Sequence, residues 1–147
     1  MAVKPIPDGF HTVTPYLVVP GVAKLLDFLQ QAFAAEEIVR MPRPDGAIMH
    51  AEVKIGDSIV MMGEPMGDHT PMPGSIYLYV HDADTVYRRA LQAGATSTME
   101  PADQFYGDRS AGVKDPAGNQ WWIATHKEDV PPAELAKRAE AFMQQQH

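Results

Sequence analysis

The chain has 147 residues, 45% hydrophobic and 21% charged, which is typical of one globular domain with a sizeable core. It has no cysteine, which excludes disulfides, thiolate metal ligands and a cysteine nucleophile and favours a cytoplasmic location. A net charge of −7, with scattered Lys and Arg, argues against nucleic-acid binding. We see no signal peptide and no apolar run of about 20 residues, so we expect no membrane contact.

The first predicted elements are a strand and a helix. Residues 12–19 alternate with the period of a half-buried strand, with Thr12, Thr14, Tyr16 and Val18 on one side. A helix should follow, because apolar residues recur at the spacing of one helical stripe: Val22, Leu25, Leu26, Leu29 and Phe33. This stripe should face a sheet.

Three further strands are predicted in the first half. Pro44, Asp45 and Gly46 are typical turn residues and should connect strands 38–43 and 47–55 as a hairpin. Gly56 and Asp57 then turn the chain into a short strand, 58–62.

The second half repeats this order. Residues 75–80 alternate, Asp82 is a suitable N-cap, and Gly94 stands where a helix should stop. Equivalent positions are about 60 residues apart, which indicates a structural duplication. We predict a single domain over 1–147, with module one at about 11–63, a linker at 64–73, module two at about 74–126 and a C-terminal helix at about 131–145.

Several motifs resemble those of a known superfamily. They are the closing run Gln104–Arg109 followed by Val113–Trp122, the opening run His11–Leu17, and Asp45–Gly46 leading to His50–Glu52 and Gly56–Asp57. The chain is similar in these to the vicinal oxygen chelate superfamily, the glyoxalase/bleomycin resistance/dioxygenase fold, and to its PhnB-like branch. The resemblance covers residues 11 to about 130. It implies an α+β fold in which two βαβββ modules form curved mixed sheets around a pocket.

The resemblance also locates the superfamily's four metal-ligand positions. They fall on Thr14 and Ser75 in the first strand of each module, and on Met61 and Trp122 in the last strands. None of these side chains is a usual ligand of a divalent transition metal. We therefore expect no metal and no other cofactor.

The residues with the same strand parity should line the concave pocket. They are Thr14, Tyr16, Met61, Ser75, Tyr77, Tyr79 and Trp122. Adjacent strand residues point to opposite sides, so Trp121 should lie in the core. Phe105 and Tyr106 form either a lid over a ligand or a plug at the end of the sheet. Arg109 either clamps an anionic ligand group or forms a salt bridge with Asp108 or Asp115.

One strand keeps polar groups on the concave side. His50, Glu52 and Lys54 alternate with apolar residues, so His50 and Glu52 should be neighbours. A carboxylate that holds one imidazole nitrogen leaves the other free to accept a proton, which makes His50 and Glu52 candidate catalytic residues. A structural hydrogen-bonded pair is the other interpretation.

Two functions fit these observations. The first is metal-independent binding of a small, partly aromatic or apolar molecule, in which Tyr and Trp supply stacking surface. The alternative is a lyase, isomerase or dioxygenase with an unconventional metal held by His50 and Glu52, or with metal-free acid–base chemistry. The apolar stripe of the C-terminal helix, which includes Leu135, Phe142 and Met143, predicts a homodimer.

Overall fold

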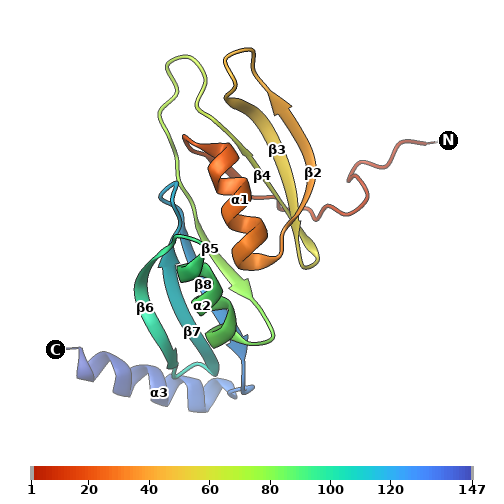
Figure 1. Cartoon of the computed structure of the whole chain (residues 1–147). Coiled ribbons are helices and arrows are strands. Elements are labelled where there is room, and N and C mark those ends of the chain that lie inside the picture. The colour runs from red at the N-terminus through yellow and green to blue at the C-terminus, as the bar shows by residue number, and fades with distance from the viewer. Residues whose placement is uncertain (1, 147) are drawn as a thin grey trace.

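The computed structural model describes residues 2–146, and in this range the chain forms two four-stranded sheets and three helices (Figure 1). Module one contains β1 (Tyr16–Val18), α1 (Val22–Phe33), β2 (Glu36–Pro42), β3 (Ile48–Ile55) and β4 (Ser58–Gly63). Module two contains β5 (Ser75–Tyr79), α2 (Ala83–Gln92), β6 (Thr96–Asp103), β7 (Asp108–Lys114) and β8 (Gln120–His126). The C-terminal helix is α3 (Pro132–Gln145).

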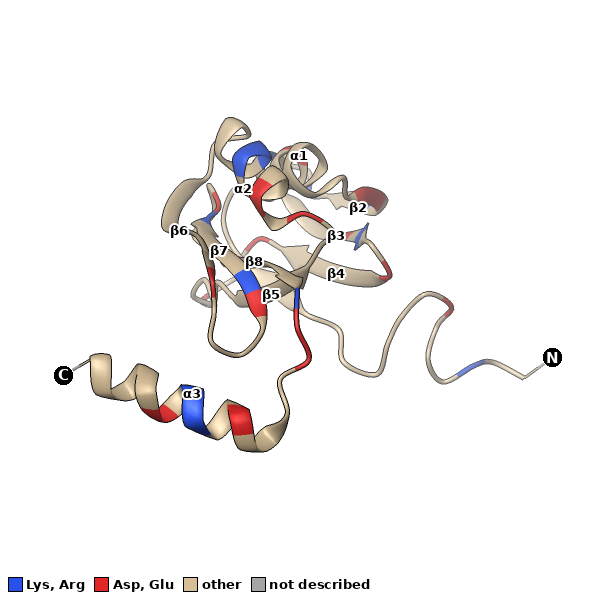
Figure 2. Ribbon diagram, turned by 90° about the horizontal axis from the view of Figure 1, so that it is seen from below, with Lys and Arg blue, Asp and Glu red and all other residues tan. Residues whose placement is uncertain are grey.

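The two modules have the same topology. Their strand orders are β1-β4-β3-β2 and β5-β8-β7-β6, and in each module the first strand is parallel to the last. Helices α1 and α2 contact each other and lie on one side of the sheets, whereas α3 lies on the other side (Figure 2). The structure thus confirms the α+β class and the repeated βαβββ order.

The first strand is shorter than the predicted 12–19. Only Tyr16–Val18 pairs regularly with β4. Pro15 has no backbone N–H, and the Thr14 hydroxyl donates instead to the carbonyl of His11 at 3.2 Å. The Pro15 carbonyl still accepts from the Met61 N–H of β4 at 2.9 Å, and turn-forming interactions replace sheet pairing before Pro15.

The sequence predicted both ends of α2 but not the way in which α1 begins. Asp82 caps α2 as predicted, because its side chain accepts a hydrogen bond from the Thr85 N–H at 3.2 Å. Gly94 has φ 113° just after this helix, again as predicted. Helix α1 instead begins after Gly21 at φ 72°, without a side-chain cap.

Trp121 links the cores of the two modules. It is fully buried, and its ring centroid lies 4.9 Å from that of Phe33 at the end of α1. Its indole N–H donates to the buried carboxylate of Asp115 at 2.8 Å. Trp122 is only partly buried, so the predicted opposite orientation of the two tryptophans is confirmed.

Helix α3 has a small contact with the rest of the chain. None of its described residues is buried, and the ring of Phe142 lies 5.0 Å from that of Phe105. Arg138 fixes the helix further by donating to Glu128 and to the carbonyl of Phe105. Met143 remains 58% exposed. Within residues 2–146, α3 and the other helices are too short or too polar to cross a membrane.

Candidate functional site

The concave face of module two carries a cluster of aromatic side chains. Tyr77 and Trp122 are register partners on β5 and β8 and therefore share this face. The indole N–H of Trp122 donates to the Ser75 hydroxyl at 3.2 Å. Together with Tyr106 they border a shallow hollow of about 230 Å³, which is lined by Tyr77, Met99, Gln104, Tyr106, Ser110 and Trp122.

A buried carboxylate fixes the tyrosines at one end of this face. Asp108, at the start of β7, is 4% exposed and accepts hydrogen bonds from the hydroxyls of Tyr77 at 2.7 Å and Tyr79 at 2.9 Å. Its other oxygen lies 2.8 Å from Nδ1 of His126, whose Nε2 lies 2.6 Å from Asp129. The tyrosine rings are thus held in place before any ligand binds.

The same contacts set the charges of this cluster. Burial alone would raise the pKa of Asp108, but hydrogen bonds from His126, Tyr77 and Tyr79 outweigh burial and lower it. Hydrogen bonds to Asp108 and Asp129 raise the pKa of His126. The pKa of Tyr77 is raised by burial and by its hydrogen bonds to Tyr106 and Asp108. These contacts therefore favour the imidazolium form of His126 beside the buried carboxylate and the neutral form of the phenols.

The sequence interpretation did not identify Asp108 and His126 as site residues. The alternation of β8 carries a signal for His126, which has the same parity as Trp122. The pairing of Asp108 with His126 across β7 and β8 depends on the sheet register. A motif search does not include that information.

The concave face of module one holds the predicted polar pair. Nε2 of His50 lies 2.9 Å from the carboxylate of Glu52, as expected for neighbours on one face of a strand. Met61 is the register partner of both Tyr16 and Glu52, which confirms its place on that face. The Tyr16 hydroxyl lies 3.1 Å from Nδ1 of His50, a contact that the sequence did not predict.

Other predicted site residues lie elsewhere or have other contacts. Arg109 is on the helix side of its sheet, where it donates to Asp84 on α2 at 2.7 and 3.0 Å and to Asp103 at 3.2 Å. This position corrects the ligand-clamp interpretation, and the salt-bridge partners differ from the expected Asp108 and Asp115. The hydrogen bonds to Asp84 and Asp103 raise the pKa of Arg109.

The two predicted lid residues, Phe105 and Tyr106, contact different parts of the protein. Phe105 packs against Phe142 of α3, which agrees with a plug at the end of the sheet. Tyr106 borders the hollow and its hydroxyl lies 3.5 Å from that of Tyr77. Thr14 lies before the paired part of β1.

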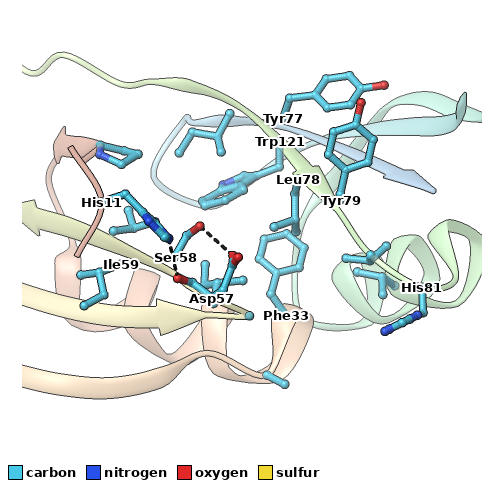
Figure 3. A pocket seen from close by; sticks show the side chains of 18 of the residues that line it. His11, Phe33, Asp57, Ser58, Ile59, Tyr77, Leu78, Tyr79, His81 and Trp121 are labelled. Carbon is cyan, nitrogen blue, oxygen red and sulfur yellow. Dashed lines mark hydrogen bonds between the residues drawn. The ribbon is translucent and has the colours of Figure 1, made fainter. Parts of the chain in front are cut away.

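A larger cavity lies where the two modules meet. This cleft has a volume of about 820 Å³, and Phe33, Leu78 and Trp121 are among its apolar wall residues (Figure 3). Its polar rim is largely paired within the protein, because Nε2 of His11 bonds to the Asp57 carbonyl at 2.9 Å and Ser58 donates to the Asp57 side chain. Tyr77 and Tyr79 border the cleft as well, so it adjoins the aromatic face.

The residues at the four expected metal positions do not have the side chains of metal ligands. Thr14, Ser75, Met61 and Trp122 offer neither imidazole nor carboxylate. His50 and Glu52 bring only two ligating side chains together, and residues 2–146 contain no group of three or more His, Cys, Asp or Glu side chains that could hold a metal ion. These residues do not fit the metal centre that the superfamily implies.

The fold defines this chain as an α+β protein of two paired βαβββ modules, with α1 and α2 on one side of the sheets. The sequence model of the Glyoxalase/Bleomycin resistance protein/Dioxygenase superfamily matches residues 9–123, and the chain belongs to this superfamily. The earlier resemblance is thereby confirmed at the superfamily level.

Relatives and solved structures agree with this assignment. Protein Mb0911c of Mycobacterium bovis and Rv0887c of Mycobacterium tuberculosis are each 36% identical to this chain in an alignment 134 residues long. The alignments cover 84% of this chain, 88% of Mb0911c and 79% of Rv0887c. TioX from Micromonospora sp. ML1 has a similar fold, with a TM-score of 0.68 at 24% identity over 79% of this chain and 98% of TioX. A lactoylglutathione lyase from Agrobacterium tumefaciens gives a TM-score of 0.61 at 18% identity over 83% and 96% of the two chains.

Proposed function

We propose that this protein binds a small, partly aromatic or apolar molecule without the metal used by many superfamily members. The observation that carries this proposal is the prearranged aromatic face of module two, where Tyr77, Tyr106 and Trp122 surround a hollow. Aromatic rings bury a large area and favour stacking, and their fixed rotamers reduce the entropic cost of binding. The polar atoms of Ser75 and of the tyrosine hydroxyls would orient the ligand.

The cleft between the modules is the competing place for such a ligand. Its volume of about 820 Å³ is in the range typical of ligand pockets, whereas the hollow of about 230 Å³ is smaller. We favour the aromatic face because Tyr77, Tyr106 and Trp122 present their rings around one hollow, which gives an aromatic molecule a stacking surface.

The two tryptophans distinguish these places. Trp121 borders the cleft and Trp122 borders the hollow. We would screen aromatic small molecules by fluorescence with Trp121→Phe and Trp122→Phe, each of which retains one indole. Binding at the aromatic face should change the emission of Trp122. A ligand that changes only the Trp121 emission would move the site to the cleft, and the lack of any ligand in a broad screen would argue against the binding function.

The enzymatic alternative is a lyase, isomerase or dioxygenase that uses an unconventional metal or metal-free acid–base chemistry. The hydrogen bond between His50 and Glu52 is the observation in its favour. A thermal-shift series with nickel, zinc, iron and manganese addresses the metal form of this alternative, since an ion that binds the native state raises its stability. We expect no shift.

We further infer that the protein acts as a cytoplasmic homodimer of the PhnB-like branch. Phe142 and Met143 are exposed apolar residues of α3, at 41% and 58%. Exposed apolar surface of this kind suits burial against a second copy.

A further inference from the structure

The concave face of module one contains a chain of three hydrogen-bonding side chains. The Tyr16 hydroxyl lies 3.1 Å from Nδ1 of His50, and Nε2 of His50 lies 2.9 Å from the Glu52 carboxylate. The side chains of His50 and Glu52 are 17% and 16% exposed, whereas Tyr16 is 48% exposed. Tyr16 is therefore the most exposed member of the chain.

The contact with the carboxylate orients the imidazole. An ionised carboxylate only accepts hydrogen bonds, so Nε2 of His50 donates to Glu52. In the tautomer whose single proton is on Nε2, Nδ1 has a free lone pair and accepts the hydrogen bond of the Tyr16 hydroxyl. Nδ1 of this tautomer can take the phenolic proton, and the Glu52 carboxylate would stabilise the imidazolium that forms.

The backbone is shaped to allow this contact. A Cβ atom placed on Gly63 of β4 would lie 2.9 Å from the Tyr16 hydroxyl oxygen and even closer to the carbonyl oxygen of Met49. Because Gly63 has no side chain, the Tyr16 phenol can lie beside it and contact His50 without a steric clash. Lys54 lies on the same face of β3, two residues beyond Glu52, and adds a positive charge there.

Tyr16 differs in this respect from the other four tyrosines. Tyr77 and Tyr79 donate to the Asp108 carboxylate, Tyr87 is 8% exposed and donates to Ser97, and the Tyr106 hydroxyl lies near that of Tyr77. Hydrogen bonding to Asp108 raises the pKa of Tyr79. Among the five tyrosines, all within the described residues, only Tyr16 has an imidazole as a hydrogen-bond partner.

We propose that Tyr16, His50 and Glu52 form a proton relay that activates the Tyr16 phenol as a base toward a small molecule. The phenol oxygen takes a proton from the molecule while its own proton passes to Nδ1 of His50, and reversal of these transfers restores the relay without a co-reactant. Tyr16 is the group that would touch the molecule, and His50 and Glu52 act through it.

The relay predicts an unusually reactive phenol, which can be measured without the natural ligand. Benzenesulfonyl fluoride is a suitable probe, because a phenol forms the S–O bond as the S–F bond breaks, fluoride leaves and the base takes the phenolic proton. Peptide mass spectrometry of the full chain would give the labelling rate of each tyrosine. Positioned general bases accelerate such steps by about 100-fold or more, so we expect Tyr16 to react at least about tenfold faster than Tyr106 and Tyr79.

The variants separate base activation from simple exposure. His50→Gln keeps a hydrogen-bond acceptor but cannot take a proton, so it should reduce the Tyr16 rate to that of Tyr106. Glu52→Gln should reduce it partly, and it also tests the relay if His50→Gln fails to fold. His69→Gln is the matched control, since it removes an exposed imidazole from the linker between the modules and should leave Tyr16 labelling unchanged.

The labelling rates either support the relay or overturn it. Equal labelling of Tyr16 and Tyr106 in the native protein, or an unchanged Tyr16 rate in folded His50→Gln, would overturn the relay and leave a structural hydrogen-bond network. The relay lies on module one, whereas the proposed ligand hollow lies on module two, and the probe reports on Tyr16 without any ligand. Its failure is therefore distinct from a failure of the Trp122 fluorescence response.

Discussion

Replacement of Trp121 should destabilise the protein far more than replacement of Trp122, although the two residues are adjacent in β8. Trp121 is fully buried, packs 4.9 Å from the Phe33 ring and donates a 2.8 Å hydrogen bond to buried Asp115. Large-to-small changes at such positions cost about 3–5 kcal/mol. Trp121→Ala also loses the hydrogen bond to Asp115, so its cost should lie near the upper end of this range. The free energy of unfolding should fall by about 5 kcal/mol.

Trp121→Phe separates the ring from the hydrogen bond. Phenylalanine keeps most of the apolar contact but has no N–H for Asp115, and a lost hydrogen bond to a charged group costs about 1.5–3 kcal/mol. Trp122 lies on the partly exposed concave face and its N–H donates to exposed Ser75. Trp122→Ala should therefore cost less than about 2 kcal/mol.

Urea unfolding followed by circular dichroism would measure these differences without relying on the indole being removed. Trp122→Phe serves as the control for a change of aromatic ring on the same strand. If Trp122→Ala were the variant that loses about 5 kcal/mol, the assignment of faces along β8 would be wrong by one residue. The aromatic face, together with the expected metal-ligand position at Trp122, would then have to be reassigned.

Three further predictions concern metal, assembly and pH. Nickel, zinc, iron and manganese should not raise the melting temperature, and a stoichiometric ion whose removal by a chelator lowers it would contradict this. Light scattering should show a dimer, and deletion of residues 131–147 should weaken it. A dimer that survives the deletion would exclude α3 from the interface. A monomeric full-length chain would contradict the dimer itself. His126 has a raised pKa in the fold because of Asp108 and Asp129, so the stability it adds is complete below the unfolded histidine pKa of about 6.5 and is lost as pH rises through the folded value. The difference in unfolding free energy between the native chain and His126→Gln should shrink from pH 6 to pH 9, and a difference that grows would refute the assignment.

Much of the architecture could be predicted because the local periodicity of apolar residues determines it. The alternation of residues 75–80 and the helical stripe after Val22 depend only on which neighbours share a face, and both elements form as expected. The duplicated order of strands and helices follows from the same patterns, and so does the opposite orientation of Trp121 and Trp122. The hydrogen bond of His50 to Glu52 was also predictable, since residues two apart on a strand point the same way.

Other features depend on which distant segments meet, and the sequence alone did not determine them. Tyr16 reaches His50 because β4 lies between β1 and β3 and has Gly63 at the crossing point. Asp108 meets His126 through the register of β7 and β8, and Arg109 meets Asp84 because α2 packs over that sheet. Local periodicity assigns a side chain to a face, whereas strand order and register decide its partners. The hydrogen-bond networks of the site and the cleft between the modules were therefore decided by the tertiary structure.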